Sequence, residues 1–284
     1  MKLSFIVFSF FICCTLFAQE QTFHILDKSN KKPISFATVK VLHSTRGVIA
    51  GEKGDFNLLI LPNDTIIVSS IGYHTLRMVG SEVGNEILLS PKVSNLASVT
   101  IRNRKPEKVF HLGFDTDTLN YWGTWGPSSG KPEFAQEFFL PIDEKEYKMN
   151  KIFIPVDKQG CFSQLILHVY EKDSSTGMPG EPIFQKLVAV NRKNVKKEIL
   201  TIDLSLDSLY LSDMDSFFIG ISWAPSDDKK CILGLKMFYN MTNTYSRLLG
   251  RNTYDWFPFG TQKTSKGEHS FAGVAWKVEL EQYH

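Results

Sequence analysis

The chain has 284 residues, and its 32 lysines and arginines nearly balance its 30 aspartates and glutamates. Because the net charge is close to zero, no strong field attracts nucleic acid, and we expect none as a partner. The length is sufficient for two domains of ordinary size.

The N-terminus carries the pattern of a secretory signal. Lys2 precedes an apolar run that ends at Phe17, and small Ala18 stands before polar Gln19. This run is short for a lasting membrane helix, although an N-terminal anchor is the alternative. Ile12 before the two cysteines does not suit a lipoprotein signal, which needs a small residue there. We therefore predict a signal peptide at residues 1–18 and an exported protein, in the periplasm or associated with the outer membrane or cell surface. No transmembrane segment is expected in the mature chain.

Two cysteines, Cys161 and Cys231, remain after the predicted signal is removed. An oxidising compartment would permit a disulfide between them, and two free thiols are the open alternative. Neither cysteine has CxxC spacing, so neither redox catalysis nor a zinc site is expected.

Short strand-like runs with turn signals between them fill residues 22–101. They are rich in Val, Ile, Thr and Phe, and no helical periodicity separates them, which predicts a small antiparallel sandwich. The predicted strands are TFHIL, ATVKV, DFNLLI, TIIVSS, HTLRMV, EILLS and SVTI.

Two glycines mark corners of this sandwich. Gly54 suits a turn residue with positive φ, directly before a strand that begins around Phe56. Gly72 ends the run TIIVSS because a residue without Cβ lets the chain reverse. Tyr73 is then expected to fold its ring over the sandwich end while its hydroxyl stays in water.

The stretches KKPISFATVKV, GVIAGEKGDFNLLI, DTIIVSSIGYHTLRMV and EILLSPKVSNLASVTI together resemble the carboxypeptidase-D regulatory-like domain, which is common at the front of exported Bacteroidetes proteins. The resemblance implies a seven-stranded, transthyretin-like Greek-key sandwich at residues 19–101 that is not itself catalytic. The loop of residues 51–56 has fewer acidic residues than the family pattern, which disfavours a cation there.

A linker and a second domain are predicted after this sandwich. RNRKPEK, residues 102–108, is charged and interrupted by proline. Residues 109–284 contain longer strands and Gly/Pro-rich connections, which favour a larger, jelly-roll-like sandwich. Its middle part resembles a β-sandwich that recurs behind this N-terminal domain and carries no activity to transfer. The clearest strands are SQLILHVYEKD, KEILTIDLSLDSL, SFFIGISW, CILGLKMFY and FAGVAWKVELEQ.

One motif in the second domain invites an enzymatic interpretation. His168 and Glu171 form an H-x-x-E, the first half of a metallocarboxypeptidase zinc site, with His269 as a third ligand. On a strand, however, residues three apart point to opposite faces, so the two diverge. A zinc metallopeptidase is therefore the least favoured of three hypotheses, and His168 is predicted to be a surface or half-buried residue.

Other catalytic patterns are missing from the sequence. There is no G-x-S-x-G and no phosphate-binding glycine loop. DTDTLN, residues 115–120, lacks the glycine and terminal glutamate of a calcium loop. We predict no enzyme activity, no catalytic residue, no bound metal and no cofactor.

Aromatic residues in loops are the remaining candidates for binding. They are Trp122, Trp125, Tyr254 and Trp256. Flat rings in Gly/Ser/Pro-rich loops can stack on sugars or hold a peptide, or they can close the ends of a sandwich. The leading hypothesis is a non-catalytic binding or assembly module of the cell envelope, with an envelope protein or a glycan as partner. The alternative is a carbohydrate-binding accessory protein that uses the tryptophans.

Overall fold

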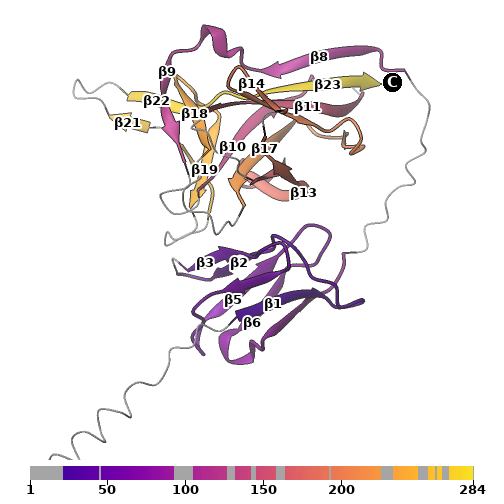
Figure 1. Cartoon of the computed structure of the whole chain (residues 1–284), viewed down its shortest axis with the longest axis vertical. Helices are drawn as coiled ribbons and strands as arrows, with labels where there is room; N and C mark the ends of the chain where they lie inside the picture. The colour runs from indigo at the N-terminus through magenta and orange to yellow at the C-terminus, as the bar shows by residue number, and fades with distance from the viewer. Residues whose placement is uncertain are drawn as a thin grey trace, which may run out of the picture.

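The computed structural model describes residues 22–44, 46–92, 105–126, 132–141, 145–157, 164–191, 193–224, 233–248, 255–259, 261–263 and 269–283. Across these residues the chain consists of strands, turns and two short 3₁₀ segments, η1 (Gly80–Glu82) and η2 (Thr116–Thr118). The predicted all-β class is confirmed (Figure 1). Within the described ranges, no helix has the length and apolar character that a membrane crossing requires.

The first seven strands form two sheets. One has the order β4-β1-β7 and the other β3-β2-β5-β6. All neighbours are antiparallel except β1 and β7, which pair in parallel and thus correct the purely antiparallel expectation. The strands are β1 (Thr22–Asp27), β2 (Thr38–Val41), β3 (Gly47–Ile49), β4 (Asp55–Asn57), β5 (Thr65–Ser69), β6 (Leu76–Val79) and β7 (Glu86–Leu89).

These sheets enclose a core of their own, built by strict alternation. On β5, Ile66 and Val68 are fully buried, whereas their neighbours on the strand are half-buried on the other face. The predicted strand SVTI lies outside the described residues, and β3 was not predicted. The core side chains are Phe23, Ile25, Ile34, Ala37, Val39, Val41, Ala50, Phe56, Ile66, Val68, Ile87 and Leu89.

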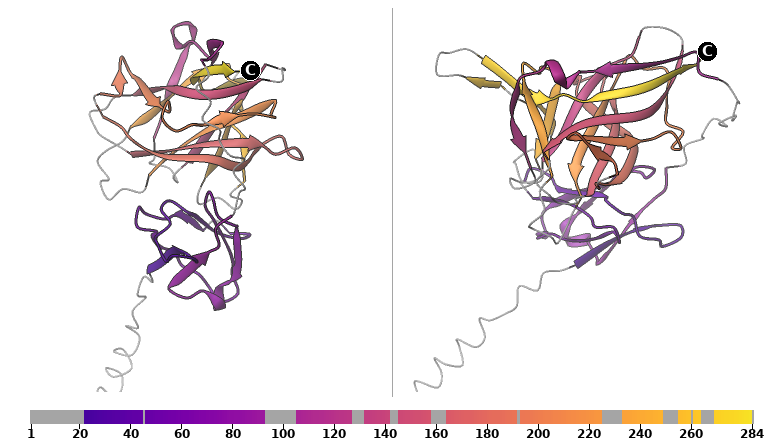
Figure 2. Two further views of the ribbon diagram at one scale, coloured as in Figure 1. Left: turned by 90° about the vertical axis from the view of Figure 1, so that its right-hand side faces the viewer. Right: turned by 45° about the horizontal axis from the view of Figure 1, so that its top comes forward.

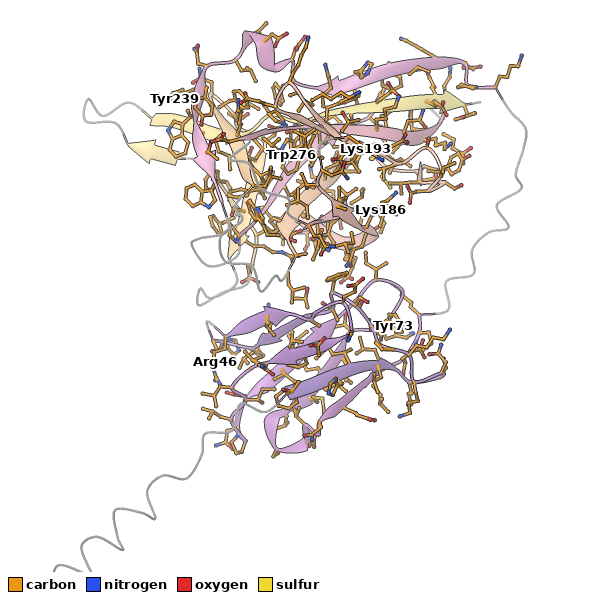
Figure 3. All side chains as sticks on the ribbon, viewed as in Figure 1. Arg46, Tyr73, Lys186, Lys193, Tyr239 and Trp276 are labelled. Atoms are coloured by element: carbon orange, nitrogen blue, oxygen red, sulfur yellow. The ribbon has the colours of Figure 1, made fainter. Side chains whose placement is uncertain are left out.

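The two predicted corner glycines both adopt positive φ. Gly54 has φ 72°, and a Cβ there would lie 2.6 Å from the carbonyl oxygen of Ile25. Gly72 has φ 79°. The hydroxyl of Tyr73 (labelled in Figure 3) donates a 3.0 Å hydrogen bond to Oδ2 of Asp27, a partner that the sequence did not predict. This bond fixes the corner to the end of β1.

The described residues from 105 onward form two larger sheets. One has six strands in the order β13-β12-β17-β10-β19-β20, and β11 lies at the centre of a second sheet with ten. The strands of the first are β10 (Pro132–Phe139), β12 (Gln164–Lys172), β13 (Pro179–Ala189), β17 (Ser216–Trp223), β19 (Thr244–Leu248) and β20 (Phe257–Pro258). Those of the second are β8 (Lys108–Gly113), β9 (Tyr121–Trp125), β11 (Glu146–Asp157), β14 (Val195–Lys196), β15 (Ile199–Asp203), β16 (Tyr210–Leu211), β18 (Gly234–Tyr239), β21 (Thr261–Lys263), β22 (His269–Val274) and β23 (Lys277–Tyr283).

The main hydrophobic core lies between these two sheets. The run FAGVAWKVELEQ is divided into β22 and β23 rather than forming one strand, and between them the side chain of Gln136 bonds the backbone of Trp276. Oε1 of Gln136 accepts a hydrogen bond of 2.6 Å from the Trp276 backbone nitrogen, and Nε2 donates one of 3.2 Å to the Trp276 carbonyl oxygen. The predicted inward residues are nonetheless all fully buried: Val274, Trp276, Val278 and Leu280.

The β3-β2-β5-β6 sheet faces the outer side of the six-stranded sheet (Figures 1 and 2). A small apolar cluster joins them, in which Ile49 packs with Ile166 and Ala224, and Phe36 and Leu187 pack against its edge. The two sets of sheets are therefore in contact through a limited apolar surface, beside which polar residues gather.

Candidate functional site

The outer face of the six-stranded sheet carries charged side chains that are buried. On β10, Phe134 and Phe138 point into the main core, so Glu133 and Glu137 must lie on the opposite face. Glu133 is only 2% exposed. A buried carboxylate needs charged or hydrogen-bonding partners, and the neighbouring strands supply them.

Three side chains converge on Glu133. Arg247 stands directly opposite on β19, and its Nε and Nη2 lie 2.8 and 2.6 Å from Oε2. Tyr170 on β12 donates its hydroxyl to Oε1 at 2.5 Å, and Arg247 Nη2 also donates to that hydroxyl at 2.9 Å. Nδ1 of His168 lies 3.0 Å from Oε1. We call Glu133, His168, Tyr170 and Arg247 the Glu133 cluster.

The electrostatics of the cluster keep Glu133 ionised. Burial by itself would raise the pKa of this carboxyl. The charge of Arg247 and the contacts with His168 and Tyr170 outweigh burial and lower the pKa from 4.5 to about 2. At neutral pH Glu133 is thus an anion, and the guanidinium of Arg247 balances its charge within the cluster.

Aromatic and glycine residues hold the cluster in place. The guanidinium of Arg247 lies 4.5 Å from the ring centre of Trp256, a cation–π arrangement, and Trp256 meets Tyr170 edge-on. Gly220 on β17 leaves the room that the cluster needs. A Cβ there would lie 2.7 Å from Cε2 of Tyr170 and 2.9 Å from Oε1 of Glu133.

A cleft of about 220 Å³ opens between the two sets of sheets beside this cluster. His168, Tyr170 and Arg247 line one side, and residues of β2 and β5 line the other. Lys40 lies at this junction, with its Nζ 3.7 Å from Asp255. The buried polar cluster borders a space that is large enough for a small ligand at this cleft, and we take the cleft as the candidate functional site.

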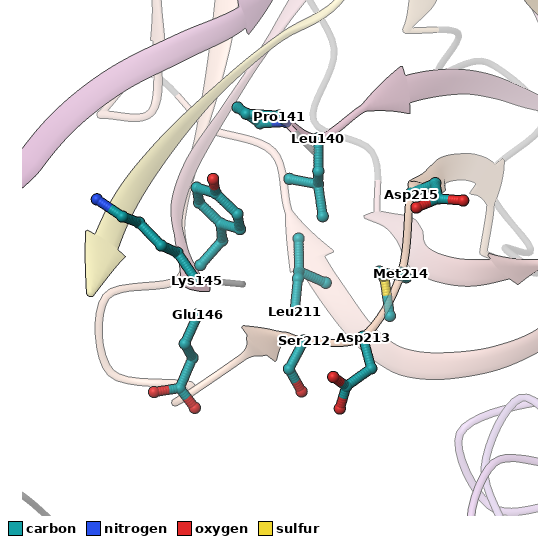
Figure 4. Close-up of a pocket in the computed structure, with 10 residues that line it drawn as sticks. Leu140, Pro141, Lys145, Glu146, Leu211, Ser212, Asp213, Met214 and Asp215 are labelled. Atoms are coloured by element: carbon teal, nitrogen blue, oxygen red, sulfur yellow. The ribbon is translucent and has the colours of Figure 1, made fainter. Parts of the chain in front are cut away.

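A second cavity, of about 640 Å³, lies near β11 and β16 (Figure 4). Leu140, Leu211 and Met214 contribute apolar surface, and Asp213 and Asp215 contribute carboxylates. Two of its lining residues adjoin residues 142–144, which lie outside the described residues. This cavity lacks the interlocked polar cluster that distinguishes the cleft.

The residues predicted as a binding site are distributed rather than gathered. Trp122 and Trp125 on β9 are partly buried against the main core, and Trp125 meets Phe134 edge-on. Trp256 instead covers the Glu133 cluster. Tyr254, Cys161 and Cys231 lie outside the described residues.

His168 corrects one prediction. It was expected to be at the surface or half-buried, but it is 7% exposed, because the β3-β2-β5-β6 sheet lies across the cleft and Glu133 and Tyr170 lie beside the imidazole. Glu171 is exposed and pairs with Phe217 on β17, whereas His168 pairs with Gly220 on the same strand. Because Phe217 and Gly220 are three residues apart on one strand, they lie on opposite faces, and so do Glu171 and His168. Among the described residues, no group of three His, Cys, Asp or Glu side chains is arranged to hold a metal.

Sequence reasoning missed Glu133 and Arg247. The available signal was local: in PEFAQEFF, glutamates alternate with phenylalanines in an otherwise buried strand. Such alternation in a strand covered on both faces indicates a carboxylate with an internal partner. The partner itself has no local sequence signal.

Comparison with known families agrees with the N-terminal fold. Residues 24–101 match the CarboxypepD_reg-like domain model, so the predicted resemblance is confirmed for this part of the chain. No curated protein sequence matches.

Solved structures offer only distant likenesses. The cysteine protease and lectin-like domains of Cwp84, a surface layer associated protein of Clostridium difficile, share 11% identity over 54% of this chain and 32% of theirs, with a TM-score of 0.35. A variant of the clostridial cysteine protease Cwp84 after propeptide cleavage shares 10% over 82% and 50%, with a TM-score of 0.40. The infectious bursal disease virus Gt strain structure shares 8% over 92% and 62%, with a TM-score of 0.28. This chain therefore spans less than two thirds of each, and these scores carry no functional argument.

Proposed function

We propose that this protein is an exported, non-catalytic binding protein of the cell envelope. In this proposal a CarboxypepD_reg-like sandwich at residues 19–101 and a larger, jelly-roll-like sandwich at residues 109–284, joined by a linker at 102–108, form one recognition unit. The observation that carries the proposal is the cleft built jointly by the two sets of sheets over the Glu133 cluster.

The chemistry of the cluster supports binding rather than catalysis. A general acid or base works best with a pKa near the operating pH. Glu133, with a pKa of about 2, stays ionised, and both of its oxygens already accept contacts from protein donors. A group so engaged holds its neighbours in position instead of exchanging protons with a substrate.

Retention of envelope polymers by the mature chain, residues 19–284, tests the binding role. We expect co-sedimentation with purified peptidoglycan or an outer-envelope polysaccharide, with no change in the length distribution of the polymer. The variant Thr75→Trp places a large ring at the cleft, where Thr75 is an exposed lining residue, and should reduce retention. Asn63→Trp, at an exposed turn away from the cleft, is the matched control and should not. Cleavage of the polymer, or equal retention by the two variants, contradicts the proposal.

Export and location form a separate part of the proposal. The support is the apolar run of residues 3–17 followed by Ala18. Mass spectrometry of the protein recovered from cell fractions should find Gln19 as its first residue in the periplasmic, outer-membrane or cell-surface fraction. Full-length protein confined to the cytoplasm would contradict this part.

A further inference from the structure

The walls of the cleft present hydroxyl and amide groups from both sets of sheets. Thr38 on β2 and Ser69 on β5 are opposite each other in the antiparallel register, so their side chains share one face. That face lines the cleft, where Ser70 and Thr75 also lie. From the other side, Gln185 on β13 is paired with His168 on β12, and both line the cleft. Hydroxyl groups both donate and accept hydrogen bonds, which suits a ligand that does the same.

The charges at the cleft are already compensated within the protein. Arg247 is held by Glu133, and Lys40 lies beside Asp255. An acidic ligand would have to compete with these carboxylates, and it would also approach Glu181, an exposed lining residue. Like charges near one another are unfavourable, so the cleft disfavours an anion.

The apolar lining and the volume of the cleft restrict the class of ligand further. Phe36, Ile67 and Pro182 line the same cleft as the hydroxyls. A volume of about 220 Å³ equals about seven water molecules at ~30 Å³ each. A sugar ring has this scale and this combination, with apolar C–H faces and a rim of hydroxyl groups that both donate and accept.

We propose that the cleft binds a single neutral sugar residue, free or at the end of a glycan. This inference rests on the proposed binding function and specifies its ligand. Thr38, Ser69 and Gln185 bind the sugar hydroxyls, and Phe36 and Pro182 contact its C–H face. Glu133 keeps His168 and Tyr170 in position at the wall of the cleft.

Titration of the mature chain with soluble sugars tests the proposal. The probes are the methyl glycosides of glucose, galactose, mannose and N-acetylglucosamine, with glucuronic acid and galacturonic acid as acidic counterparts, measured by calorimetry and ligand-observed NMR. We expect at least one neutral glycoside to bind and the acidic sugars to bind more weakly. Binding only of acidic sugars, or of none of the probes, overturns the proposal.

A matched pair of variants places the binding in the cleft. The double variant Thr38→Val, Ser69→Ala removes two hydroxyls while keeping residues that strands accept, and it should weaken binding by about tenfold or more. Thr65→Val removes a hydroxyl from the same face of β5, beyond the cleft, and should leave the affinity unchanged. Circular dichroism and thermal unfolding show whether both variants fold. Equal affinity of the two folded variants overturns the proposal.

The two proposals can fail separately. If envelope polymers are retained and the Thr75→Trp variant loses them, but no neutral glycoside binds or competes, the sugar inference is wrong and the binding function stands. If sugars bind in the cleft but no polymer is retained, the sugar inference stands and the proposed retention of envelope polymers is wrong.

Discussion

Glu133 and Arg247 face each other across the adjacent strands β10 and β19, with Oε2 and Nη2 2.6 Å apart and both side chains largely covered. Within a sheet, directly opposed residues are the closest neighbours, so this register alone brings the two charges together. Arg247 Nε donates to the same oxygen, so two nitrogens of the guanidinium share Oε2, while Oε1 is left to Tyr170 and His168.

The first prediction concerns loss of the Glu133 charge. Glu133→Gln keeps the shape of the side chain but leaves Arg247 without its main counter-charge at a mostly buried position. Removing one partner of a buried pair typically costs about 3–5 kcal/mol. We expect a loss of that size in the free energy of unfolding, measured by urea denaturation.

Glu171→Gln is the control for this substitution. It removes a carboxylate from the same sheet at an exposed position, where changes usually stay within about 0.5 kcal/mol. If the two variants unfold at the same urea concentration, the cluster does not stabilise the fold as we infer.

The pairing of Glu133 with Arg247 shows which part of the site could not be predicted from the sequence. The strand SFFIGISW was predicted with the bounds that β17 has, because an apolar β-rich run between turn signals is a local property. Glu133 and Arg247 are 114 residues apart, and no local pattern indicates that β10 and β19 will be neighbours. Strand order thus decides the site, and the order arises from packing of the whole sheet.

The N-terminal corner illustrates the opposite case. Gly54 was predicted at positive φ and Gly72 at a chain reversal because only local backbone sterics are involved, and both glycines have positive φ. The partner of the Tyr73 hydroxyl was missed because Asp27 lies 46 residues away on another strand. Local conformation could be predicted from the sequence, whereas the partners of polar atoms could not.

The second prediction concerns the space around Gly220. In Gly220→Ala, the new Cβ would lie under 3 Å from both Tyr170 and Glu133, and neither can withdraw without loosening the cluster. Overpacking of this kind typically costs about 1–3 kcal/mol. Thermal unfolding should show the loss, together with altered fluorescence of Trp256, which packs on Tyr170.

Gly123→Ala serves as the comparison, since a Cβ at this strand glycine on β9 meets no atom within 4 Å. It should leave stability unchanged or slightly higher. A Gly220→Ala protein as stable as Gly123→Ala would show that the cluster adapts to the extra methyl group.

The third prediction concerns pH. The pKa of Glu133 in the folded protein, about 2, lies below its ordinary value of 4.5. Stability from this group is therefore complete above about pH 4.5, declines as the pH falls, and is lost at about pH 2, because the unfolded chain takes up the proton first. The shift corresponds to ~3 kcal/mol over this range.

Urea unfolding of the wild type and Glu133→Gln between pH 6 and pH 3 measures this contribution. The wild type should lose more stability on acidification than the variant, since other carboxylates are common to both. Parallel pH profiles of the two proteins would be inconsistent with a depressed pKa at Glu133.

The last prediction concerns the hydroxyl of Tyr73. Burial, followed by the hydrogen bond to Asp27, raises the pKa of this phenol, so it remains a donor at physiological pH. Tyr73→Phe keeps the ring against the N-terminal core and removes only the bond to Asp27, which should cost about 1–2 kcal/mol. Tyr121→Phe removes a hydroxyl that bonds Thr124 at an exposed position and should cost less. Hydrogen exchange at the amides of β1 and of the corner should quicken only in Tyr73→Phe. Unchanged exchange there would mean that Gly72 and the packed ring suffice to hold the corner without the hydroxyl.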